Sequence, residues 1–158
     1  MKKIILLIAF SVFVVGCKPK QQVTSTKVDN KSERVIKGDW TITSVTYPGS
    51  EVIKVKSFEL ADSKCFVGST WRFVSNNNTG SMALSAAGCD SYSADITWYI
   101  NKEGRFVMKF LDEELKAKKV KQGYILTVAN QTETSFQLLD GINVGGKMVN
   151  VVYQFEKK

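Results

Sequence analysis

The 158-residue chain contains no histidine, only two prolines and only three cysteines. Without histidine the chain cannot form a Ser-His-Asp or Cys-His catalytic arrangement, and the commonest general base is missing. A zinc site is disfavoured as well, because no two cysteines form a Cys-x-x-Cys pair. The sequence also has no Gly-rich phosphate loop and no dinucleotide-binding fingerprint. These absences argue against an enzyme, a metal site and a cofactor.

The N-terminal segment has the character of a signal peptide. Lys2 and Lys3 precede residues 4–15, a run of twelve residues without a charge. A helix of that length spans about 18 Å, well short of the roughly 30 Å hydrocarbon core of a bilayer. We therefore interpret residues 1–16 as a signal peptide that is removed, not as a membrane-spanning helix.

The segment ends in Val14-Val15-Gly16-Cys17, which resembles the lipobox of bacterial lipoproteins. The resemblance implies that Cys17 becomes the lipidated N-terminus after cleavage, with acyl chains such as palmitate. Two or three acyl chains give a lasting membrane anchor, whereas one chain is marginal. An ordinary secreted protein with a stray cysteine is the alternative. Because Lys18 follows instead of an aspartate, the resemblance favours the outer membrane, facing the periplasm.

Residues 17–37 are predicted to be a flexible lipidated tether, because almost nothing in them is apolar before Val35. The tether contains six basic and two acidic residues, and therefore holds +4 of the total charge of +7. Residues 38–158 contain 14 basic and 13 acidic residues and are nearly neutral. The positive charge suits an anionic membrane surface as the partner, and it gives little reason to invoke nucleic acid.

Cys65 and Cys89 remain as an even pair once Cys17 is assigned to the lipid. In an oxidising compartment such a pair is expected to form a disulfide. Closing a loop of about 25 residues would stabilise the fold by roughly 3 kcal/mol in the chain-entropy model. Two free thiols and a pair of metal ligands are the alternatives.

Residues 38–158 suffice for one domain with one core, and their pattern is strand-like almost throughout. Ile96, Trp98 and Ile100, for example, alternate with Thr97 and Tyr99, and a period of two indicates a sheet with one buried face. Turns rich in Asn and Gly separate the apolar runs, as hairpins require. We predict an all-β fold, an eight-stranded antiparallel up-and-down barrel, with strands near residues 39–46, 70–75, 81–86, 94–100, 105–111, 122–129, 134–139 and 147–156.

Two stretches do not fit this series of strands. Residues 51–64 are compatible with a short helix, an extra strand or a lid-like loop, and the pattern does not choose among them. Residues 112–119 are compatible with one or two helical turns. Before the last strand, we interpret Asp140-Gly141 and Gly145-Gly146 as turn residues.

Gly38-Asp39-Trp40 is similar to the Gly-x-Trp motif that opens the first strand of lipocalins. Residues 65–73 and 151–157 also look like those of lipocalin-like lipoproteins from Bacteroidetes-type bacteria. The resemblance covers residues 38–158 and implies a barrel whose closed end is plugged by the tryptophan. The chain departs from the family in one respect, because lipocalins pack an arginine from near the last strand onto that tryptophan. No arginine follows residue 105 here.

The lipocalin resemblance implies a carrier or sensor that holds a small hydrophobic molecule inside the barrel. The alternative is that the same bulky side chains fill the interior. The candidate lining residues are Trp71, Phe73, Trp98, Met108, Phe110 and Tyr124.

A second hypothesis is a protein-interaction or inhibitor module in the cell envelope. Residues 51–68 and 85–90 would form a loop surface held rigid by the bridge between Cys65 and Cys89. Loops on rigid scaffolds often carry such functions. Unpaired apolar area inside the barrel would favour the carrier, and apolar area on the loops would favour the module.

Overall fold

The computed structural model describes residues 30–50, 54–111 and 123–158. The predicted signal peptide, residues 1–16, lies outside these ranges, and so do Cys17 and the helical turns expected at 112–119. None of the helices in the described ranges is both long enough and apolar enough to cross a bilayer.

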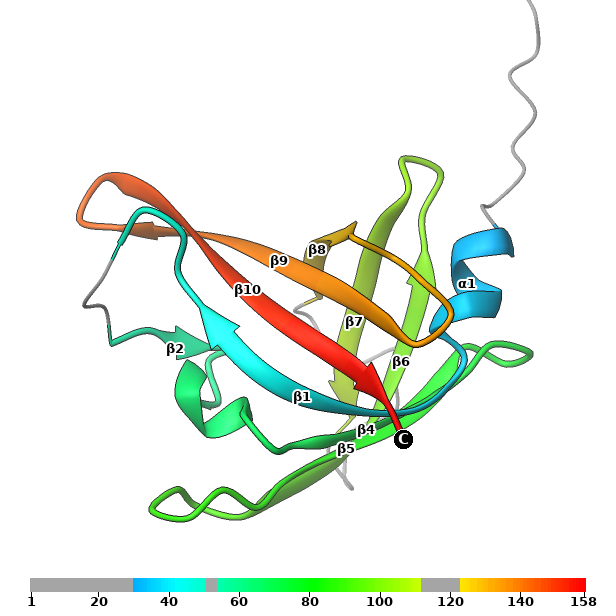
Figure 1. Ribbon diagram of the computed structural model, residues 1–158, viewed down its shortest axis with the longest axis horizontal. Helices are drawn as coiled ribbons and strands as arrows, with labels where there is room; N and C mark the ends of the chain where they lie inside the picture. The colour runs from blue at the N-terminus through cyan, green and yellow to red at the C-terminus, as the bar shows by residue number, and fades with distance from the viewer. Residues whose placement is uncertain (1–29, 51–53, 112–122) are drawn as a thin grey trace, which may run out of the picture.

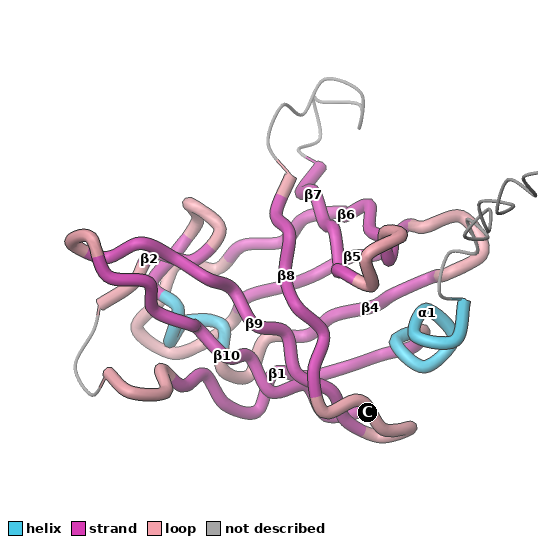
Figure 2. The backbone as a smooth tube through the Cα atoms, turned by 90° about the horizontal axis from the view of Figure 1, so that it is seen from above, coloured by secondary structure: helices cyan, strands magenta, loops and turns pink. Residues whose placement is uncertain are grey.

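Eight antiparallel strands form a closed barrel (Figures 1 and 2). Each barrel strand pairs with the next one along the chain, and the first strand pairs with the last to close the sheet. This confirms the predicted up-and-down barrel. The barrel strands are β1 (Gly38–Thr46), β4 (Thr70–Val74), β5 (Thr79–Leu84), β6 (Tyr92–Ile100), β7 (Arg105–Leu111), β8 (Tyr124–Ala129), β9 (Ser135–Val144) and β10 (Lys147–Lys157).

The strand boundaries agree closely with the alternation pattern, except in β9. That strand was expected to end at residue 139 but continues through Asp140 and Gly141 to Val144. The interpretation of Asp140-Gly141 as turn residues was therefore wrong. Gly145 and Gly146 adopt φ values of 60° and 86° and make the hairpin turn by themselves, so the strand has no need to end earlier.

The barrel interior is filled with aromatic and aliphatic side chains. Trp98 stacks on Phe106 with ring centroids 5.6 Å apart, and Phe73 meets Trp98 at 5.3 Å. Gly80 is required by this packing, since a Cβ atom there would lie 2.2 Å from the carbonyl oxygen of Arg72. The part of the barrel interior around Trp98 is therefore a packed core.

Helix α1 (Asn30–Ile36) precedes β1 and lies at one end of the barrel (Figure 1). Ile36 is fully buried, and a carboxylate oxygen of Glu33 accepts a hydrogen bond of 3.1 Å from the backbone N–H of Ile100. The last residues of the predicted 17–37 tether thus belong to the folded domain. Two apolar residues, Val35 and Ile36, at the end of a polar segment gave little sign of this.

The stretch between β1 and β4 folds at the opposite end. It contains a small hairpin of β2 (Lys56–Ser57) and β3 (Ala61–Asp62), followed by the 3-10 helix η1 (Ser63–Phe66). Of the alternatives weighed for residues 51–64, the described part therefore combines short strands with a single helical turn. We call this end of the barrel the mouth.

Candidate ligand site at the barrel mouth

Five aromatic rings gather at the mouth around Phe58, and we call them the mouth cluster. Phe58 comes from the tip of the β2–β3 hairpin and is only 7% exposed. Its ring centroid lies between 5.1 and 5.7 Å from the centroids of the four other rings. These distances are ordinary for favourable aromatic pairs. The four neighbours are Phe66, Phe110, Tyr124 and Tyr153.

The hairpin tip holds Phe58 in an unusual backbone conformation. Phe58 and Glu59 adopt φ values of 54° and 55°, the left-handed region that is costly for residues other than Gly, Asn and Asp. The N–H of Leu60 donates to the carbonyl of Ser57 at 3.0 Å and closes the turn. An Asn-Gly pair is the usual choice for such a turn. Here a strained turn presents an aromatic ring to the barrel interior.

Two tyrosine hydroxyls from the barrel strands hold the hairpin by hydrogen bonds. The Tyr124 hydroxyl donates to the carbonyl of Phe58 at 2.6 Å, and the Tyr153 hydroxyl donates to Oγ of Ser57 at 2.5 Å. Burial raises the pKa of both phenols above the ordinary value. The tyrosines therefore remain neutral donors, and the hairpin is held by a few polar contacts instead of by a continuous ladder.

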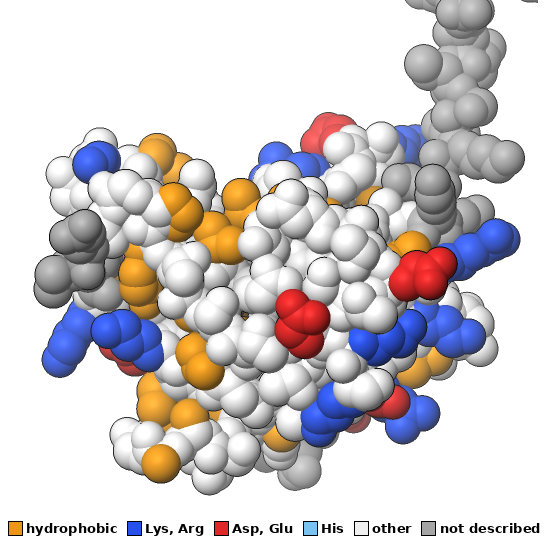
Figure 3. Space-filling model, in the orientation of Figure 1, with side chains coloured by type: hydrophobic (Ala, Val, Ile, Leu, Met, Phe, Trp, Pro, Cys, Tyr) orange, Lys and Arg blue, Asp and Glu red, His pale blue; other side chains and the backbone are white. Residues whose placement is uncertain are grey.

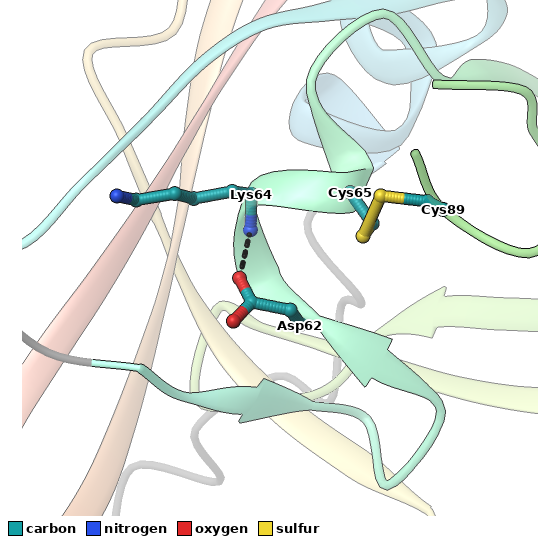
Figure 4. The surroundings of a disulfide bond; sticks show 4 residues. All are labelled: Asp62, Lys64, Cys65 and Cys89. Carbon is teal, nitrogen blue, oxygen red and sulfur yellow. Dashed lines mark hydrogen bonds between the residues drawn. A yellow bond between two sulfur atoms is a disulfide. The ribbon is translucent and has the colours of Figure 1, made fainter. Parts of the chain in front are cut away.

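A disulfide joins η1 to the loop that follows β5 (Figure 4). Cys65 and Cys89 are bonded, with their Cα atoms 5.9 Å apart, which confirms the predicted bridge. Beside it, the Asp62 carboxylate accepts a hydrogen bond of 2.9 Å from the N–H of Lys64 and caps η1. The bridge therefore links the stretch between β1 and β4, which we call the mouth insertion, to the loop between β5 and β6.

The six predicted lining residues divide between core and mouth. Trp71, Phe73, Trp98 and Met108 are at most 3% exposed, and the three aromatic ones among them pack ring against ring. Phe110 and Tyr124 are partly exposed and belong to the mouth cluster. Contact of any of the six with a ligand stays a prediction.

Trp40 of the Gly-x-Trp motif is fully buried at the closed end, as the resemblance implied. Its ring meets Phe136 edge to face at 4.7 Å, and its indole N–H donates to the carbonyl of Ile36 at 2.7 Å. The amino group of Lys157 lies 5.7 Å from the centroid of the Trp40 ring. A lysine thus takes the place in which lipocalins put an arginine.

Strands β8 and β9 separate at the mouth. Their described pairing runs only from Thr127 opposite Leu139 to Ala129 opposite Gln137. Beyond that point, the start of β8 pairs with β7 and the end of β9 pairs with β10. Asp140 is the first residue of β9 past the separation.

Of two residues at the mouth, Asp140 could have been predicted from the sequence and Phe58 could not. Asp140 belongs to the alternating series Phe136, Leu138, Asp140 and Ile142, of which the others pack in or against the core. That series would have identified an inward carboxylate. No sequence signal identified Phe58, because a Phe-Glu turn has none of the residues that favour positive φ.

A polar groove of about 920 Å³ lies on the outside of the barrel, across the outward faces of β1, β4, β5 and β6. Asp39 and Arg72 face each other there at 3.9 Å, but both are more than half exposed, so their ion pair contributes little to stability. No group of His, Cys, Asp and Glu side chains in the described part of the chain is placed to hold a metal ion. Further residues of the groove are Thr70, Ser81, Ala83, Ser93 and Asp95.

Comparison with known proteins gives a family and a set of distant folds. A family model described as Lipocalin-like domain matches residues 36–138. Curated protein sequences yield no match. Among solved structures, the chain is similar to bovine odorant-binding protein in complex with a selenium-containing odorant, at 10% identity and a TM-score of 0.45, covering 80% of this chain and 72% of that one. It is also similar to odorant-binding protein OBP1, at 14% identity and a TM-score of 0.44, covering 80% and 73%. Similarity at this level says nothing about the ligand of this chain.

Proposed function

We propose that this chain, which belongs to the lipocalin-like domain family, holds a small apolar molecule in the mouth of its barrel and acts as a binder, not as an enzyme. The observation that carries the proposal is the position of Phe58. Four aromatic neighbours surround its ring at 5.1–5.7 Å, so the mouth contains a site that fits an apolar ring. The residue that fills this site comes from a hairpin tip, not from the barrel wall.

Ligand entry would replace the Phe58 ring by the ligand. The tip has two residues in the left-handed region, and such strain favours movement of a segment that few contacts hold. In the bound state the ligand would contact Phe110, Tyr124 and Tyr153, while the packed core around Trp98 would stay unchanged. The ligand would then be about the size of one or two rings.

Native mass spectrometry of the protein purified from its own cell envelope tests this function. We expect a discrete added mass of metabolite size beyond that of the lipidated chain from Cys17 to Lys158, and less of it after addition of an excess of a naphthalene-based competitor. An unadorned mass, together with no uptake of such a competitor, would contradict the proposal.

We also propose that the protein is a lipocalin-like lipoprotein of the Bacteroidetes type, anchored through Cys17 to the outer membrane and facing the periplasm. The sequence Val14-Val15-Gly16-Cys17 and its short apolar run support this. Growth with alkyne-tagged palmitate should label the protein, and Cys17→Ser should abolish the label and release the protein from the membrane fraction. Labelling that persists in the variant would contradict the anchor.

A second candidate function is an envelope protein-interaction module. The outer groove and the disulfide-held insertion favour it, because both lie on the barrel surface. Crosslinking in intact cells, with a photoreactive residue in place of Ser93, would capture a partner under this hypothesis. The same residue in place of Ile125, on β8, is the control. The carrier hypothesis predicts equal results at both positions.

A further inference from the structure

The interior face of the mouth carries one acidic side chain. In β9, Phe136, Leu138, Asp140 and Ile142 alternate with residues on the outer face, and the three apolar ones pack in or against the core. Among the described barrel strands, Asp140 is the only acidic residue that shares its face with the core. It lies where β8 and β9 cease to pair, so it is half-buried and still reachable from solvent.

The Asp140 carboxylate has no basic partner within the described residues. No ion pair or hydrogen bond joins it to any of them. Lys147, the basic residue of the same hairpin, pairs with Val144 at the far tip. Buried charges in proteins are normally paired, so an unpaired inward carboxylate calls for a partner from outside the described chain.

The charged and polar groups that act on the two phenols beside Asp140 are acidic or neutral. Asp140 acts electrostatically on Tyr124 and Tyr153, the two phenols that hold the hairpin. Glu59 at the hairpin tip also acts on Tyr124, as does Tyr92, and Tyr47 acts on Tyr153. All of these groups are acidic or neutral. Burial raises the pKa of the Asp140 carboxyl above its ordinary value, which is the behaviour of a carboxylate that no cation stabilises.

We propose that the mouth recognises an apolar amine: a molecule whose ring-sized body takes the place of Phe58 and whose protonated nitrogen binds Asp140. The proposal rests on the proposed function, since it names the ligand class of that same site. An ammonium on a half-buried carboxylate forms a charge-assisted hydrogen bond, about twice as strong as a neutral one. The faces of Tyr124 and Phe110 add attraction for a cation.

Two probes of one shape separate this inference from the proposed function. Naphthylmethylamine is cationic at neutral pH, and naphthylmethanol is neutral. Their binding to the chain from Lys18 to Lys158, which contains every described residue, is measured by calorimetry at low salt. We expect the amine to bind on the order of tenfold more tightly than the alcohol.

Asp140→Asn should remove the preference for the amine, chiefly by weakening the binding of the amine. Asp95→Asn is the matched control, because Asp95 is an exposed acidic residue on the outer face of β6, and it should leave the preference intact. In the wild type, the preference should decline as the pH falls through the raised pKa of Asp140. In Asp140→Asn it should not change over the same range.

Each outcome decides between the two proposals. Equal binding of both probes to the wild type, or a preference that survives in Asp140→Asn, would overturn the amine inference and leave the apolar site standing. Failure of both probes to bind the wild type and the Phe58→Ala variant would overturn the site itself.

Discussion

The two ends of the barrel place aromatic rings in opposite surroundings. At the closed end, Trp40 and Phe136 are fully buried, and the Lys157 amino group lies over the Trp40 ring. At the mouth, the rings around Phe58 lie among hydroxyl groups, a strained turn and the Asp140 carboxylate, which pairs with none of the described residues. The closed end has the composition of a structural core. The mouth, where hydrophobic side chains reach the surface at the left of Figure 3, has the mixture of apolar area and few polar groups that is typical of small-molecule sites.

The largest effect is expected from the closed end. Phe136→Ala removes a fully buried ring that stacks on Phe155 at 4.5 Å, and it should lower the free energy of unfolding by about 3–5 kcal/mol. Phe110→Ala removes a partly exposed ring at the mouth and should cost less than half as much. Urea unfolding of the two variants checks the difference. Equal losses would mean that the mouth is also a structural core.

The second-largest effect is expected from removal of the disulfide, which should affect the mouth more than the closed end. Replacement of both Cys65 and Cys89 by Ala should cost roughly 3 kcal/mol, because the unfolded chain regains the freedom of the closed loop. Hydrogen exchange should accelerate most in residues 63–69 and least in the pairing between β1 and β10. An equal acceleration throughout the barrel would contradict a local role for the bridge.

Substitutions at Phe58 can separate the effect of its ring on stability from the effect of its strained backbone. Both Phe58→Ala and Phe58→Gly remove the ring, but only glycine adopts the φ of 54° without cost. Phe58→Gly should therefore be more stable than Phe58→Ala by about 1 kcal/mol. Thermal unfolding measures this, and Leu60→Gly against Leu60→Ala is the control at a neighbouring position without positive φ. Both Phe58 variants should take up naphthylmethanol more tightly than the wild type.

Asp140 gives the mouth a pH dependence that the closed end does not share. Because burial raises its pKa in the folded state, folding favours the protonated carboxyl, and stability is lost as the pH rises through that pKa. Asp140→Asn should therefore stabilise the protein at neutral pH by on the order of 1 kcal/mol at most, given its partial exposure. The gain should vanish below the ordinary value of 3.8. Unfolding midpoints from acid to neutral pH check the sign.

The smallest effect is expected from Lys157. Its amino group lies over Trp40 near the surface, so Lys157→Ala should cost about 0.5–1 kcal/mol. Lys157→Arg should restore or exceed the original stability, since guanidinium groups stack well on aromatic rings. Lys147→Ala at the hairpin tip is the neutral control. If Lys157→Ala leaves the free energy of unfolding unchanged, the contact between Lys157 and Trp40 does not stabilise the closed end.

The barrel could be predicted well from the sequence because a regular strand produces a local alternation of side chains. In residues 105–111, Phe106, Met108 and Phe110 alternate with Val107 and Lys109, and the segment forms β7 within the expected limits. The two cysteines were paired correctly from their number and the expected compartment alone. β9 was placed too short, because Asp140-Gly141 has the composition of a turn while the true turn is Gly145-Gly146. Local composition could not choose between an Asp-Gly pair and a Gly-Gly pair five residues apart.

The candidate site was less predictable because its parts are brought together by tertiary structure. Phe110 and Tyr124 were named as lining residues from alternation, and both lie at the mouth. The ring that occupies the site, Phe58, sits in a stretch whose pattern fitted three kinds of structure. Its place follows from two hydrogen bonds: the Phe58 carbonyl accepts one from Tyr124 on β8, 66 residues away, and the Ser57 hydroxyl accepts one from Tyr153 on β10, 96 residues away. No local pattern encodes such partners.

The pairing of the first strand with the last has a consequence for the order of events during synthesis. Trp40 lies opposite Lys157, so the ladder that closes the barrel joins nearly the two extremes of the domain. The ribosome must complete β10 before this closure is possible, and contacts of such sequence separation form slowly. A newly made domain therefore stays open until its last strand has been synthesised.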